Sequence, residues 1–307
     1  MIELEIGLSS FKDMTKEKKL DDKINEFKSQ FPNVKLSLYD GIDSIFSSGR
    51  KSINGIKETI ENIDIINQNN VPFILVMSSG LLFDKLPLQK LSFEKDILYY
   101  LEQNAKKEEI KNGVVIGHDD LLHYVRKFNP DLKTICSTIQ MIDINKFTSY
   151  EDKFQKYDLV VPLNQHTSYN FLKQYEQYAD KMLLFLNLPC YDGDLLKCYK
   201  HYAKIELNIL GSYGEIPEKV KFDYNDLSTR EKFELVLNDD DSKKAKQLPQ
   251  NQCKNIGCTS VEGNSNVLYL RDDFIQLYSM GVNKFKIPRE FELPIHQLNS
   301  IKAILKF

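Results

Sequence analysis

Several common signals are missing from this sequence of 307 residues. No apolar run is long enough to cross a bilayer, and the first residues lack the basic start and apolar stretch of a signal peptide. The net charge of -3 is too small to indicate nucleic acid or an anionic membrane as the partner. We therefore expect a cytoplasmic protein that does not bind membranes.

Short motifs of familiar enzyme classes are missing as well. The sequence has no P-loop, no G-x-G-x-x-G, no H-E-x-x-H and no G-x-S-x-G, so nothing in it specifies a nucleotide-dependent enzyme or a serine hydrolase. Cysteine is scarce, with five residues. Because the cytoplasm disfavours disulfides, we expect these cysteines to be free thiols, metal ligands or core residues.

What the sequence does contain is an alternation of strand-like and helix-like segments. Apolar residues recur every three or four positions at 51–68, 119–128 and 166–179, which predicts amphipathic helices. Several strand-like runs are continuously apolar, as is typical of parallel strands covered on both faces. The eight expected strands are residues 2–7, 34–39, 73–77, 113–117, 133–137, 158–162, 181–187 and 283–287.

Eight strands alternating with helices predict an α/β fold, a single (β/α)8 TIM-type barrel domain over residues 1–307. A doubly wound sheet with a small second domain is the alternative. The alternation breaks once, at residues 188–270, a polar, turn-rich segment between the seventh and eighth strands. So long a loop is uncommon in a compact domain unless it is functional, so we expect an insertion or subdomain over the C-terminal face.

The fourth expected strand ends beside the most reactive pair of side chains in the sequence. Chemistry in such barrels gathers at the C-terminal ends of the strands, and His118 with Asp119 follows such an end. A histidine at this place can act as an acid or a base, so the two are the candidate catalytic residues. The alternative is that Asp119 caps the following helix and His118 only fills the turn.

Four further residues form a candidate substrate-binding set. Arg50 stands beside an expected helix start, where backbone amides and a guanidinium group favour an anion, although an ordinary helix-initiating turn explains this segment too. Asn187, Lys286 and Arg289 stand at the ends of the seventh and eighth expected strands. The same rule about strand ends also nominates Tyr39, Asp40, Ser78, Ser137, Thr138 and Asn164.

Four of the cysteines lie in the segment 188–270, as two pairs with the spacings C-x7-C and C-x4-C. The pairs are Cys190 with Cys198, and Cys253 with Cys258. Four thiolates suit zinc or an iron–sulfur cluster, but these spacings follow neither the zinc-ribbon nor the ferredoxin pattern. Four thiols without a metal are therefore an equal alternative. Cys136 lies in an apolar run and is expected in the core.

The closing stretch, residues 270–287, resembles the late barrel region of the collagenase-like peptidase family U-32. That region carries the pattern Y-x-x-G-[IV]-x-x-F-K-I-x-G-R, and this chain matches it at Tyr278, Gly281, Val282, Phe285, Lys286 and Ile287. The family's Gly-Arg is replaced by Pro288-Arg289, so the arginine stands one residue early. Residues 46–50, 158–162 and 187–201 are similar to the family more loosely.

The resemblance implies a barrel and, in several branches of the family, a 4Fe-4S cluster held by four cysteines. It also implies either peptidases or enzymes that hydroxylate RNA bases or quinone precursors without oxygen. Our first hypothesis is an iron–sulfur barrel enzyme acting on an anionic small molecule, peptide or RNA. The alternatives are a peptidase-like hydrolase that uses zinc or a paired acid–base system, and a non-catalytic subunit that works with a protein partner. Zinc or no cofactor at all is the alternative to the cluster.

Overall fold

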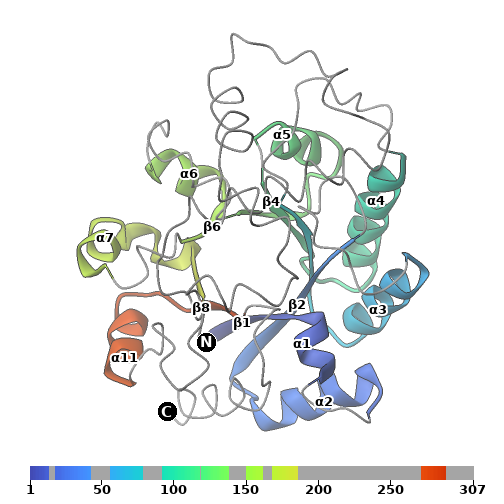
Figure 1. Ribbon diagram of the computed structural model, residues 1–307, viewed down its shortest axis with the longest axis horizontal. Coiled ribbons are helices and arrows are strands. Elements are labelled where there is room, and N and C mark those ends of the chain that lie inside the picture. Colours follow the sequence, from blue (N-terminus) through green and yellow to red (C-terminus); the bar gives the residue numbers. More distant parts are fainter. Residues whose placement is uncertain are drawn as a thin grey trace, which may run out of the picture.

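The computed structural model describes residues 1–13, 18–42, 56–78, 92–117, 119–137, 150–161, 168–185 and 271–287. Within these ranges eight parallel strands pair in sequence order and close into a barrel, with β1 beside β8. The helices surround the strands on the outside (Figure 1). The predicted (β/α)8 barrel is confirmed, and the doubly wound alternative is wrong.

Each of the eight runs predicted from the sequence contains a strand, and the bounds agree to within two residues. The apolar run at β3 gives identical bounds, because all five of its residues are buried. The strands are β1 (Ile2–Gly7), β2 (Val34–Gly41), β3 (Phe73–Met77), β4 (Gly113–Ile116), β5 (Lys133–Cys136), β6 (Asp158–Val160), β7 (Met182–Phe185) and β8 (Lys284–Ile287).

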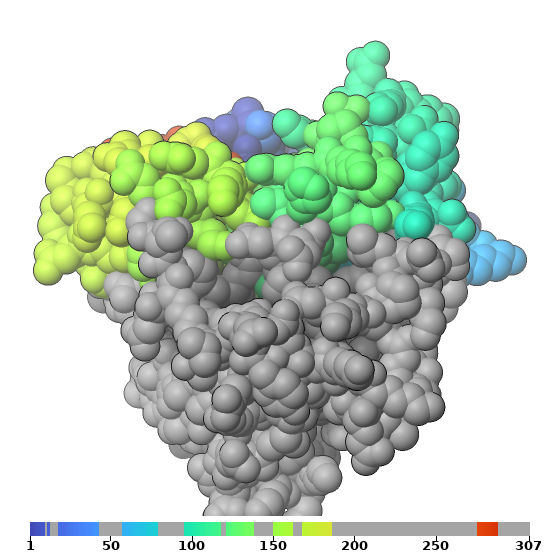
Figure 2. Space-filling model, turned by 90° about the horizontal axis from the view of Figure 1, so that it is seen from above, coloured from blue at the N-terminus to red at the C-terminus, as the bar shows by residue number. Residues whose placement is uncertain are grey.

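The described helices lie between these strands in the order that a barrel requires. Consecutive units follow one another around the outer wall, from cyan through green to yellow in Figure 2. The helices are α1 (Leu8–Asp13), α2 (Leu20–Gln30), α3 (Ile56–Gln68), α4 (Ser92–Lys107), α5 (Asp119–Phe128), α6 (Tyr150–Lys156), α7 (Tyr169–Gln174), a 3-10 helix (Glu176–Lys181) and α11 (Arg271–Ser279).

The single helix predicted for residues 166–179 is wrong. The α-helical part is α7, whose start is capped by the hydroxyl oxygen of Ser168, and the chain then tightens into a 3-10 helix. The change occurs at Tyr175, which has φ -109° and ψ 21°. The tighter turn places the rings of Tyr175 and Tyr178 both against Phe154, at centroid distances of 5.7 and 5.1 Å. Aromatic packing thus favours the break.

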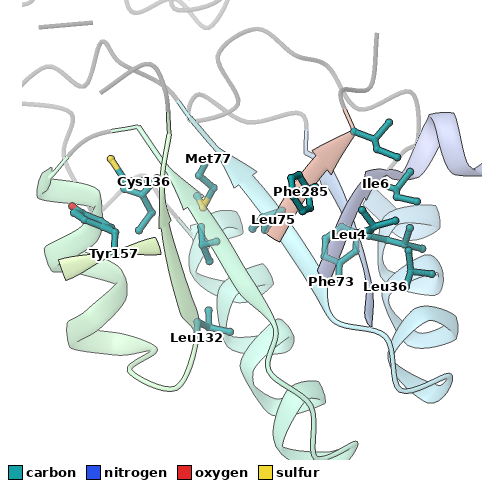
Figure 3. Packing of buried hydrophobic residues seen from close by; sticks show 14 of the residues in the cluster. Leu4, Ile6, Leu36, Phe73, Leu75, Met77, Leu132, Cys136, Tyr157 and Phe285 are labelled. Atoms are coloured by element: carbon teal, nitrogen blue, oxygen red, sulfur yellow. The ribbon is translucent and has the colours of Figure 1, made fainter. Parts of the chain in front are cut away.

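The main core lies between the strands and the helices. Along each strand alternate side chains point outward, and these are almost all large and apolar. Figure 3 shows part of this layer, with Leu4, Ile6 and Phe285 together beside β1 and β8. Cys136 is fully buried in the same layer, as predicted. Burying each such side chain contributes roughly 1.5–3 kcal/mol, so this layer supplies most of the drive to fold.

Gly113 begins β4 where the barrel wall has no room for a side chain. A Cβ atom there would lie 2.9 Å from the carbonyl oxygen of Lys133 and 3.0 Å from Cδ1 of Ile74. We expect Gly113→Ala to lower the free energy of unfolding by about 1–3 kcal/mol, because the backbone of β5 must move. Urea unfolding measures this, with exposed Lys111→Ala as the control. Equal midpoints for the two variants would contradict the expected crowding.

Candidate functional site

The interior of the barrel has an apolar cluster of its own, separate from the layer beneath the helices. It is formed by the side chains that alternate with the outward ones. Bulky residues of this kind fill the middle of such barrels and make it a packed core rather than a pore. The cluster consists of Tyr39, Ile74, Val76, Val115, Ile135, Val160 and Leu183, with Phe185 packed against it.

A buried ion pair joins the first and last strands inside this interior. Nζ of Lys286 donates a hydrogen bond to Oε2 of Glu5 at 3.2 Å. The two residues are register partners on β8 and β1, so their side chains leave the sheet on the same face. Their side chains are only 7% and 4% exposed. Because both charges have lost most of their hydration, removing one partner alone is expected to destabilise the fold.

Tyr39 of β2 forms the third part of this arrangement. Nζ of Lys286 lies 3.8 Å from the centre of the Tyr39 ring, within the range of a cation–π interaction. The Tyr39 hydroxyl donates a hydrogen bond of 2.8 Å to the backbone oxygen of Ile287, the residue after Lys286. The ring is therefore anchored to the same strand whose lysine it contacts. We call Glu5, Tyr39 and Lys286 the interior triad.

A second group of charges lies at the N-terminal ends of the strands, at the end of the barrel opposite to the C-terminal mouth. Oδ2 of Asp158 is 2.9 Å from Nζ of Lys133 and 2.8 Å from Nζ of Lys284. Burial lowers the pKa of Lys133. The negative charges of Glu5 and Asp158 and the hydrogen bond to Asp158 together raise the pKa by more than burial lowers it, so the net shift is upward. Lys133 therefore stays protonated at neutral pH. Residues at this pole of a barrel serve stability rather than chemistry.

The ends of the first five strands carry little side-chain volume toward the inside. Alternation along the strands gives Gly7, Gly41, Ser78, Gly117 and Ser137 the inward direction at this level. Backbone hydrogen bonds between neighbouring strands reach the ends of β4 and β5. The Gly117 N–H donates to the Met77 oxygen, and the Ser137 N–H donates to the Ile116 oxygen. At the ends of these five strands the inward positions are thus glycine and serine, above the packed middle of the barrel.

The structure describes the side chain of only one predicted site residue, Lys286, which lies in the interior triad. Asp119 is the first residue of α5, the position at which an acidic residue favours a helix start. Of the other nominated strand-end residues, Tyr39 belongs to the triad and Asp40 is buried on the alternate face of β2. The remaining site residues lie outside the described ranges: Arg50, His118, Asn187, Cys190, Cys198, Cys253, Cys258 and Arg289.

Glu5 is a candidate site residue that the sequence reasoning missed. Residues 2–6 alternate apolar and acidic side chains, which indicates a strand with one polar face. That alternation was a usable signal, because a polar face on a barrel strand must point into the barrel or toward solvent. It did not identify the partner, since Glu5 and Lys286 are 281 positions apart.

Comparison with known families and with curated proteins gave no match. Across the described ranges, no helix combines the length and apolar character needed to span a membrane. In the same part of the chain, no three His, Cys, Asp or Glu side chains come together as a metal site would require. The four cysteines predicted as cluster ligands are outside those ranges.

Proposed function

We propose that this chain is a barrel enzyme similar to peptidase family U-32, and that it modifies an anionic substrate at the C-terminal mouth of the barrel. The observation that supports this most is Lys286, a buried lysine of the closing strand, in a barrel whose first five strands end with inward glycine and serine. Barrels of this kind place their active sites at this mouth. The same lysine stands in the F-K-I run that resembles the family pattern.

In this proposal, residues from several strand ends share the work. Lys286, Arg50 and Arg289 bind the anionic part of the substrate, and Asn187 adds an amide to that set. His118 moves a proton, with Asp119 beside it. These roles follow from residue type and position at strand ends, the rule by which barrel enzymes gather distant residues into one site.

The segment 188–270 supplies the four thiols that the proposal assigns to a 4Fe-4S cluster: Cys190, Cys198, Cys253 and Cys258. Four thiolates are the ligand set that such clusters require. When bound, the cluster supplies electrons or Lewis-acid chemistry, while the protein places the substrate. In the sequence the segment follows β7, whose last residue is Phe185.

Metal analysis of anaerobically purified protein tests the cluster. We expect about four iron and four labile sulfide per chain, and loss of both when the four cysteines are changed to serine. Cys136→Ser is the matched control, because this thiol is buried in the core and is expected to leave the iron content unchanged. Protein without iron that folds equally well after the fourfold change would refute the cluster.

Two other outcomes would redirect the proposal. Cleavage of casein or gelatin that a chelator abolishes would indicate a metal-dependent hydrolase instead. A stoichiometric protein partner recovered from the native cell, with no turnover by the isolated chain, would indicate a non-catalytic subunit of a hetero-complex.

A further inference from the structure

A lysine that binds an anion must first be ordered. Its four-carbon side chain has many rotamers, and holding the ammonium group in one place costs conformational entropy. A protein that has already restricted the side chain avoids that cost when the ligand arrives. Contacts that fix a buried lysine are therefore part of a binding site even when they never touch the ligand.

Lys286 is fixed from two sides by residues of different strands. The Glu5 carboxylate accepts a hydrogen bond from Nζ at 3.2 Å, and the Tyr39 ring lies against the same nitrogen at 3.8 Å from its centre. The Glu5 and Tyr39 side chains that make these contacts are themselves held in place. Glu5 is 4% exposed, and the Tyr39 hydroxyl is hydrogen-bonded to the backbone of Ile287.

The contribution of this ion pair to stability does not by itself explain its presence. Seven apolar or aromatic residues form the interior cluster, and well-packed apolar side chains usually replace a buried ion pair without loss of stability. Lys286 is also the last residue but one of β8, close to the end at which barrel enzymes bind their substrates. An ion pair in this place therefore indicates that the positive charge of Lys286 serves binding rather than stability.

We propose that Glu5 is a positioning residue, which holds the Lys286 ammonium group in place to bind a phosphate or carboxylate group of the substrate. This inference rests on the proposed function, which places an anionic substrate at the C-terminal mouth. The same device is known in protein kinases, where a glutamate fixes the lysine that contacts the nucleotide phosphates. Tyr39 completes the restraint by closing the side of the ammonium group that its ring covers.

Positioning and simple attraction predict opposite effects for removal of Glu5. Glu5 carries a negative charge beside Lys286, so its removal strengthens the attraction of that lysine for any anion. If attraction alone matters, the affinity for an anion rises. If Glu5 positions the lysine, the affinity falls, because the freed side chain must be ordered by the ligand.

Titration calorimetry of the full chain at pH 7 and constant ionic strength separates the two effects. The probes are orthophosphate and succinate, used separately. We expect the wild type to bind at least one, Glu5→Ala to weaken that binding at least tenfold, and Glu5→Gln, which keeps an acceptor oxygen, to weaken it less. Glu3→Ala is the matched control, because Glu3 is on the same strand face but pairs with the exposed Lys35.

Three results would overturn the proposal: no binding of either anion by the wild type, equal or tighter binding by Glu5→Ala, or binding that persists in Glu5→Leu/Lys286→Met. The double variant removes both charges together, so we expect it to fold even where a single change destabilises the chain. Iron content is measured on the same samples. The iron content therefore tests the cluster, and the anion affinity tests the positioning role of Glu5, so failure of one proposal is distinguished from failure of the other.

Discussion

Replacing Asn112 by alanine is expected to lower the free energy of unfolding by about 3–5 kcal/mol, because several buried polar groups lose their partners together. Asn112 is fully buried just before β4. Its amide nitrogen donates to Oδ1 of Asn67 at 2.8 Å and to the Leu101 oxygen at 3.0 Å. Its oxygen accepts from the Phe73 N–H at 2.7 Å and from Asn67 at 3.0 Å.

These four hydrogen bonds connect α3, α4 and the start of β3 at a single side chain. Each buried group left without a partner costs roughly 1–3 kcal/mol, and alanine supplies none. Chemical denaturation followed by circular dichroism measures the loss. The control is Asn25→Ala on α2, an exposed asparagine whose amide reaches only Asp21. A loss of less than 1 kcal/mol for Asn112→Ala would mean that water satisfies these groups equally well.

Lys286→Met is expected to cost about 3–5 kcal/mol of stability, because it removes the ammonium group that is hydrogen-bonded to the buried Glu5 carboxylate. The expected loss is large because Glu5 is only 4% exposed. Glu5→Leu in the same chain should recover most of it, since the pair of changes replaces both members of the ion pair by apolar side chains. The two single variants and the double variant form a thermodynamic cycle that measures the coupling between the residues.

Lys35→Met serves as the matched control for this cycle. Lys35 pairs with Glu3 on the same two neighbouring strands that carry Tyr39 and Glu5, but its side chain is 65% exposed. An exposed pair of this kind contributes at most about 1 kcal/mol. If Lys286→Met were as mild as Lys35→Met, Glu5 would not need its partner, and the interior triad would have no role in holding the barrel closed.

The barrel was predictable from sequence because strand identity depends on local patterns. The run at β3 is apolar throughout, and it predicted both ends of the strand correctly. The segment after Ser168 shows why local patterns also fail. A spacing of three between Tyr175 and Tyr178 fits an α-helix and a 3-10 helix equally well, so periodicity did not distinguish them.

The candidate site was predictable only in part, because its geometry depends on which strands are neighbours. Lys286 followed from the rule about strand ends. Glu5 did not, since nothing in residues 2–6 says that the eighth strand, rather than solvent, lies beside them. The register of β1 on β8 is set only when the whole barrel closes, and that register is what brings the two charges together.

Closure of β1 on β8 also has a consequence for synthesis. Ribosomes extend a chain at about 5–20 residues per second, so the 281 positions between Glu5 and Lys286 represent roughly 15–60 seconds. During that time β1 has one edge without its final neighbour and a carboxylate without its lysine. The edge of β1 that β8 later covers is therefore the strand edge that waits longest for its partner during synthesis, and unpaired edges of this kind favour pairing with other chains.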